Sequence, residues 1–252
     1  MKRILIILFI FKLLIPFAFS QNGDHVGGGV FSKRIEYNLL LLGDGYNFNS
    51  KGDVEKLFFG DFNAPVEFFY DPSFDGASGF RIVRDTLKEA YILEIKYVSN
   101  YKEARGEALK KYPLSTPLSI DEVMDHANIP KETLELIEQR KNNWEKYFAE
   151  RNKLFKIESH SFPVSNRFAE KFYERMVSVI DNFKARGIPP IIEDGYSVTF
   201  RNIVDDEVWS LKVHIPSGNA LKLTNLCKKI IEETLTTSKP DEFNYIKLLE
   251  DF

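Results

Sequence analysis

The sequence predicts an α+β fold in which antiparallel β-hairpins pack against helices. Two kinds of pattern support this class. Short runs of alternating apolar residues are separated by polar turns, as hairpins require. Elsewhere, apolar residues recur every three or four positions, which is typical of amphipathic helices. The chain has 252 residues, 44% hydrophobic and 28% charged, which is enough to bury a sizeable core.

Strands are expected at 35–42, 66–70, 80–83, 91–98, 196–204 and 208–215. Residues 66–70 lie between Pro65 and Pro72, and the two prolines favour an edge position for that strand. In 91–98, the odd-numbered residues are uniformly apolar, so that face should meet the core. The two-residue turn Asp205-Asp206 joins the last two strands into a hairpin.

Helices are expected at 120–127, from Pro130 to about Lys153, from Ser165 to Phe183, from Asn219 to near Thr234, and in a short C-terminal segment. In the second of these, Leu134, Ile137, Trp144 and Phe148 lie on or near one stripe, and charges of both signs indicate a solvated outer face. The third has an aromatic and aliphatic stripe that we interpret as core: Phe168, Phe172, Met176, Ile180 and Phe183.

The first twenty residues have the pattern of a secretory signal peptide. Lys2 and Arg3 precede an apolar run, and Ala18 and Ser20 supply the small residues of a cleavage site. Lys12 divides the run, so neither part approaches the roughly 20 apolar residues that span a membrane. We expect cleavage after residue 20 and no stable membrane insertion afterwards. The alternative is an uncleaved anchor.

Cleavage predicts an exported protein, periplasmic or secreted, with a flexible segment at 21–33 and a single α+β domain at 34–252. Cys227 is the one cysteine, which argues against a lipoprotein, a disulfide framework and a multi-cysteine zinc site. Its helical neighbours are apolar, so we expect a buried thiol. Loss of Lys2, Arg3 and Lys12 takes the formal net charge from −3 to −6, which disfavours nucleic acid as a partner.

Two segments, 75–111 and 194–235, share an order of residue types at offsets close to 119. Each begins with Asp-Gly, continues with Phe80-Arg81 or Phe200-Arg201, and ends in a helix after a second strand. Duplication would give two related ββα halves about a pseudo-two-fold axis, with a cleft between them. Coincidence is the alternative, because turns and helix caps use few residue types.

Motifs for phosphate loops, dinucleotide binding, zinc proteolysis and esterase nucleophiles are missing from the sequence. We therefore expect no cofactor and no metal. Glu158 and His160 share a face if their segment is extended, which offers a base and a carboxylate that orients it. The competing interpretation is a structural histidine near a strand end. No nucleophile accompanies this pair.

Arg81 and Arg201 recur in the two segments and could bind carboxylates or anionic sugars, although surface arginines that cover the sheet are the alternative. Phe74 and Tyr196 are aromatic candidates for contact with a partner. The sequence favours a non-catalytic binding or interaction module with a protein or glycan partner. The alternative is an exported hydrolase that acts on envelope or extracellular material.

Overall fold

The computed structural model describes residues 34–35, 51–60, 64–85, 90–114, 131–183 and 195–252. All of them belong to one compact unit, Ser32–Phe252. The leader at 1–20, the segment 21–33, the expected helix 120–127 and most of the expected strand 35–42 lie outside the described residues.

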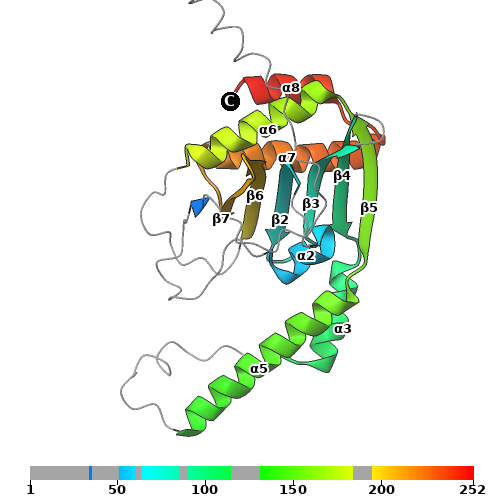
Figure 1. Cartoon of the computed structure of the whole chain (residues 1–252). Coiled ribbons are helices and arrows are strands. Elements are labelled where there is room, and N and C mark those ends of the chain that lie inside the picture. The colour runs from blue at the N-terminus through cyan, green and yellow to red at the C-terminus, as the bar shows by residue number, and fades with distance from the viewer. Residues whose placement is uncertain (1–33, 36–50, 61–63, 86–89, 115–130, 184–194) are drawn as a thin grey trace, which may run out of the picture. The chain divides into compact units, whose positions relative to one another are not determined.

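Six antiparallel strands form the sheet, in the order β7-β6-β2-β3-β4-β5, and the two-residue strand β1 pairs in parallel with β7 (Figure 1). Their bounds are β1 Arg34–Ile35, β2 Val66–Pro72, β3 Ser78–Asp85, β4 Ala90–Val98, β5 Ile157–Val164, β6 Tyr196–Val204 and β7 Glu207–His214. The described helices are α2 Asp53–Phe59, α3 Tyr101–Lys111, α5 Lys131–Leu154, α6 Asn166–Asp181, α7 Gly218–Thr237 and α8 Glu242–Glu250. The predicted α+β class is confirmed.

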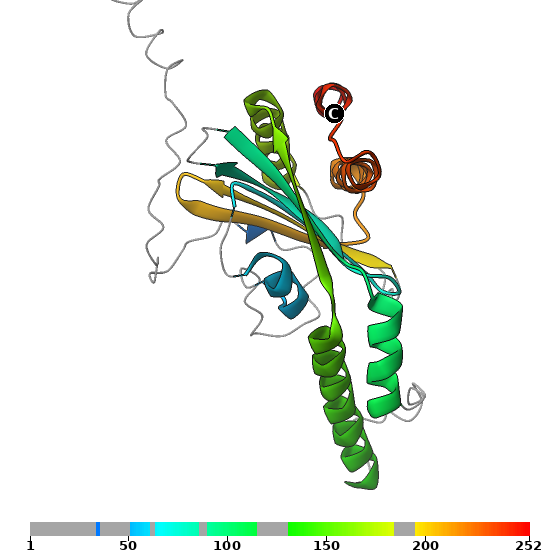
Figure 2. The ribbon, with the colours of Figure 1, turned by 90° about the vertical axis from the view of Figure 1, so that its right-hand side faces the viewer.

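The two faces of the sheet are covered differently. Figure 2 shows α6, α7 and α8 on one face and the short helix α2 on the other. The chain leaves β4 through α3 and returns through α5 to β5, so this helix pair projects from one end of the sheet (Figure 2). None of the helices in the described part of the chain is long and apolar enough to cross a membrane.

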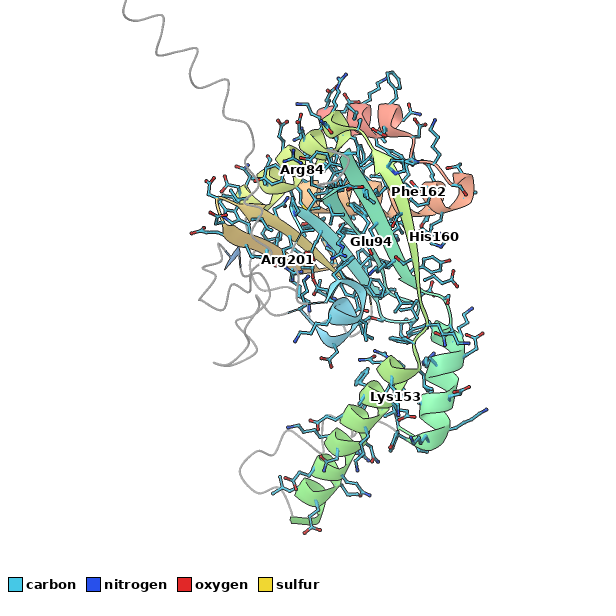
Figure 3. The ribbon with its side chains drawn as sticks, turned by 45° about the vertical axis from the view of Figure 1, so that its right-hand side comes forward. Arg84, Glu94, Lys153, His160, Phe162 and Arg201 are labelled. Carbon is cyan, nitrogen blue, oxygen red and sulfur yellow. The ribbon has the colours of Figure 1, made fainter. Side chains whose placement is uncertain are left out.

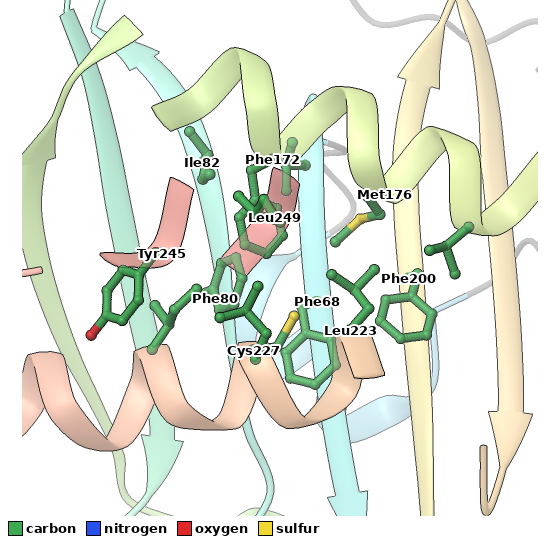
Figure 4. Packing of buried hydrophobic residues seen from close by; sticks show 14 of the residues in the cluster. Phe68, Phe80, Ile82, Phe172, Met176, Phe200, Leu223, Cys227, Tyr245 and Leu249 are labelled. Atoms are coloured by element: carbon green, nitrogen blue, oxygen red, sulfur yellow. The ribbon is translucent and has the colours of Figure 1, made fainter. Parts of the chain in front are cut away.

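The core lies between the sheet and helices α6, α7 and α8. Phe68, Phe80 and Phe200 occupy one row of neighbouring strands, and all three are fully buried. Figure 4 shows this row facing Leu223 and Cys227 of α7. The predicted stripe of α6 completes the layer, since Phe168, Phe172, Met176 and Ile180 have no exposed surface. Burial raises the pKa of the Cys227 thiol well above its usual value.

Strand β2 lies in the middle of the sheet between β6 and β3, so the predicted edge position is wrong. Pro65 precedes the strand and Pro72 is its last residue. A proline at either end removes no hydrogen bond from the middle of the ladder. The four residues from Val66 to Phe69 are all buried, because helices cover both faces at this strand.

The two hairpin–helix segments are present on either side of β2, with β3–β4 leading to α3 and β6–β7 leading to α7. Phe80 and Phe200 both lie opposite Phe68, so corresponding strands run in the same direction with corresponding residues on the same face. Their second strands, β4 and β7, extend away from β2 on opposite sides. The hairpin β3–β4 and the hairpin β6–β7 are therefore related as mirror images are, and no rotation superposes one on the other. The sheet therefore does not place these segments about the expected pseudo-two-fold axis.

Candidate functional site

A row of charged side chains crosses the sheet on the face covered by α2. The strand register places Arg201, Glu67, Arg81 and Glu94 next to one another on β6, β2, β3 and β4. The signs alternate along the row, so each charge lies beside an opposite one. Arg81 and Arg201, the arginines predicted to bind a ligand, thus flank the same glutamate. Figure 3 shows Arg201 and Glu94 on this sheet.

Arg201 is only 1% exposed and forms ion pairs with Glu55 of α2 and with Glu67, the latter at 3.4 Å between Nη1 and Oε2. Lys51 Nζ lies 3.0 Å from Glu67 Oε2, the same oxygen that pairs with Arg201. Burial lowers the pKa of Lys51, and the Glu67 carboxylate opposes that shift. This network fixes α2 to the sheet and encloses the Arg201 guanidinium, where it meets groups of its own chain.

Arg81 is also engaged within the chain, although it is less deeply buried. Its guanidinium pairs with Glu94 and lies 5.6 Å from the centre of the Phe59 ring. Its Nη1 donates to the Phe59 carbonyl at 3.5 Å, and Lys96 Nζ donates to the Phe58 carbonyl at 2.6 Å. Two cations thus meet the carbonyl end of α2, where the helix dipole favours positive charge.

Glu158 and His160 are two positions apart in strand β5 and so lie on the same face, as the sequence predicts for an extended segment. Figure 3 shows His160 on this strand. His160 Nε2 is 3.9 Å from Glu158 Oε2, and Tyr97 Oη donates to the same oxygen at 2.5 Å. This hydrogen bond lowers the pKa of Glu158. The imidazole stacks between Tyr97 and Phe162. Both members of the pair are open to solvent, so their geometry suits a surface contact better than an enclosed reaction.

The aromatic candidates Phe74 and Tyr196 are not brought together with the arginines. Phe74 is 60% exposed in the connection between β2 and β3. Tyr196 begins β6 on the opposite face from Arg201, where its ring lies 5.1 Å from that of Tyr70, and Lys228 Nζ lies 5.8 Å from its centre. The four predicted binding residues thus belong to three separate places.

Sequence reasoning missed a contact between Ser197 and His214. Ser197 Oγ lies 3.3 Å from His214 Nδ1 across the β6–β7 hairpin, and Asp71 lies opposite Ser197 on β2. Counting eight residues back from Asp205 and eight residues forward from Asp206 places Ser197 opposite His214. In the described part of the chain, the buried His214 Nε2 has no hydrogen-bond partner. Asp71 neighbours Ser197 in the sheet and does not neighbour His214, so the serine–histidine–aspartate relay of a hydrolytic triad is not formed.

A recess of about 320 Å³ opens on the α2 side of the sheet. It is lined by Phe69 and Asp71 of β2, Lys212 of β7, the first turn of α2, and Phe148 and Asn152 near the end of α5. Acidic, basic and aromatic groups therefore meet around one recess that is open to solvent. Among the described residues, no group of three or more histidine, cysteine or acidic side chains could hold a metal ion.

The predicted apolar stripe of α5 is largely exposed. Leu134, Trp144 and Phe148 are 49%, 43% and 40% exposed, and Leu136 beside the stripe is 47% exposed. The rings of Trp144 and Phe148 lie 5.3 Å apart. Helix α5 has 24 residues and its partner α3 has 11, so α3 covers only part of its length. Tyr147, on the side toward α3, is the aromatic residue of α5 that is buried.

We expect Glu67→Gln to lower the free energy of unfolding by about 3 kcal/mol, because it leaves buried cations without a full charge partner. Glu250→Gln is the matched control, since its pair with Arg167 is exposed and its loss should cost less than about 1 kcal/mol. Urea denaturation at neutral pH measures both variants. Equal stabilities for the two would contradict a role of the buried network in holding the fold.

The stability of the protein should also depend on the charge of Glu94. Burial alone would raise the pKa of this carboxyl, but hydrogen bonds and charges from Lys96 and Arg81 outweigh burial and lower it. A lowered pKa in the folded state stabilises the fold above the unfolded value, roughly pH 4.3, and this contribution disappears as the pH falls through the folded value. The stability difference between the wild type and Glu94→Gln should therefore shrink between about pH 6 and pH 3. If denaturant titrations gave the same stability difference between wild type and Glu94→Gln at every pH, the charge of Glu94 would not stabilise the fold in this way.

Neither family models, nor curated proteins, nor solved structures give a match to this chain, so no residue role is carried over from another protein.

Proposed function

We propose that the protein is an exported, non-catalytic interaction module that binds a partner protein through the apolar surface of α5. This surface, called the α5 patch below, consists of Leu134, Leu136, Trp144 and Phe148. The observation that carries the proposal is the exposure of Trp144 and Phe148 side by side on a projecting helix.

Water contact with large apolar side chains is unfavourable, and burial gains about 25 cal/mol per Å² of apolar area. Because the protein exposes four such residues along one helix, a partner that covers them lowers the free energy of the complex. Tryptophan is enriched among the side chains that dominate binding energy, and phenylalanine is enriched at interfaces in general. The charges of both signs on α5 supply the polar rim that surrounds such anchors.

The C-terminal end of α5, which carries Phe148, is held against its surroundings before any partner arrives. Arg151 lies within 6 Å of the ring centres of Tyr101, Tyr147, Phe148 and Phe155, which joins the end of α5 to the start of α3. Lys111 Nζ pairs with Glu150 at 2.9 Å and closes the other end of α3 onto α5. The part of the α5 patch around Phe148 therefore loses little conformational freedom on binding, which favours affinity.

The alternative function, an exported hydrolase, has one specific observation in its favour, the contact between Ser197 and His214. A serine hydroxyl beside an imidazole is half of an activated nucleophile. In the described residues, neither the Ser197–His214 contact nor the Glu158–His160 pair combines a nucleophile, a base and an orienting acid. The non-catalytic function is therefore the better supported of the two.

The double variant Trp144→Ala/Phe148→Ala should lose a partner that the wild type enriches from the native exported fraction. Phe243→Ala/Leu248→Ala on α8 is the matched control, because these side chains are 80% and 38% exposed on the other side of the molecule. Both variants should keep stabilities close to that of the wild type, within about 1 kcal/mol, since the truncated side chains are exposed. Quantitative mass spectrometry of the captured proteins compares them. Equal capture by both double variants would rule out the α5 patch as the binding surface.

Export has its own test. The pattern at residues 1–20 predicts that protein isolated from its native source begins at Gln21. N-terminal sequencing of that material, together with fractionation of the cells, checks this expectation. An intact Met1 in a cytosolic fraction would refute export while leaving the α5 patch untouched.

A further inference from the structure

The recess on the α2 side of the sheet has walls of three chemical kinds. Its volume of about 320 Å³ is at the lower end of the range for small-molecule sites, roughly 300–1,000 Å³. The rings of Phe69 and Phe148 supply apolar surface, and Val54 adds to it. Asp53 and Asp71 supply carboxylates, and Lys212 supplies an ammonium group.

The opposite charges that line the recess do not pair with one another. In the described part of the chain, no ion pair within 4 Å and no hydrogen bond engages the side chains of Asp53, Asp71 and Lys212. Glu55, the remaining acidic residue of the lining, is already paired with Arg201. Asn152 accepts a hydrogen bond from Arg151 through its carbonyl oxygen at 3.0 Å, so its amide N–H groups remain as donors.

We propose that this recess binds a free amino acid with an aromatic side chain. The ammonium group of the ligand would meet Asp71 and Asp53, and its carboxylate would meet Lys212 and the amide of Asn152. Its ring would lie against Phe69 and Phe148. One small zwitterion thus satisfies the acidic, basic and apolar parts of the lining at once.

The environment of Asp71 supports this assignment. Part of its surface faces solvent, yet the surrounding chain displaces enough water to raise the pKa of its carboxyl, even though Arg151 and Lys212 act in the opposite direction. An ammonium group next to it would offset that unfavourable desolvation. The recess shares only Phe148 with the α5 patch. Binding of an amino acid in the recess therefore does not depend on binding of a partner protein by the α5 patch.

Isothermal titration calorimetry of the purified protein with L-phenylalanine tests the site. Two matched probes lack one charge each: phenethylamine has no carboxylate and 3-phenylpropionate has no ammonium group. We expect L-phenylalanine to bind and each single-charge probe to bind at least about tenfold more weakly. No heat from L-phenylalanine up to millimolar concentrations, or equal affinities for the three probes, would overturn the proposal.

Variants of Lys212 and Asp71 then test which charged group of the ligand each side chain contacts. Lys212→Met should weaken L-phenylalanine by about tenfold and leave phenethylamine unchanged, because only the first ligand has a carboxylate. Asp71→Asn should weaken both ligands. Both positions face solvent, so the variants should fold. Lys229→Met on α7 is the control, since this lysine is 47% exposed on the opposite side of the sheet. Wild-type affinity for L-phenylalanine in Lys212→Met would exclude the proposed carboxylate contact.

Discussion

The buried ion pairs of Arg201 with Glu67 and Glu55 are the constraint on which the rest of the structure depends. Charges removed from water are costly unless they are paired, and here the pairing partners come from β6, β2 and α2. The network therefore requires that β6 lie beside β2, in register, with α2 above them. The apolar row of Phe68, Phe80 and Phe200 on the reverse face follows from the same register, because neighbouring residues of a strand point to opposite faces. One arrangement of charges thus fixes both layers of the fold.

Much of the local structure could be predicted from the sequence. The hairpin at Asp205-Asp206 was predictable because both turn residues tolerate a positive φ, and they adopt 48° and 64°. The stripe of α6 was predictable because Phe168, Phe172, Met176 and Ile180 follow the helical period. Local rules of this kind hold when residues close in sequence decide the outcome.

The order of the strands and the fate of the charged residues could not be predicted in the same way. The prolines that flank β2 favour an edge strand, but its central position depends on β6, which is far along the chain. Arg81 and Arg201 looked like paired binding residues because they recur, whereas their partners Glu94, Glu55 and Glu67 are defined only by the assembled sheet. Trp144 and Phe148 follow the helical period as a core stripe would, yet it is Tyr147 that is buried, and the other two rings stay exposed. Ser197 and His214 could have been found by counting register across their hairpin.

The pairing of β2 with β6 has a consequence for how the chain folds. Glu67 and Arg201 are 134 residues apart, so closing this loop costs chain entropy before the central ladder returns any free energy. The hairpins β3–β4 and β6–β7 can form early from neighbouring residues, but the middle of the sheet must wait for nearly the whole polypeptide. Until then, a nascent chain has an unpaired β2 edge, and Lys51 is available to pair with Glu67 while Arg201 is not. The native state is therefore reached late, and an incomplete chain has no shorter route to it.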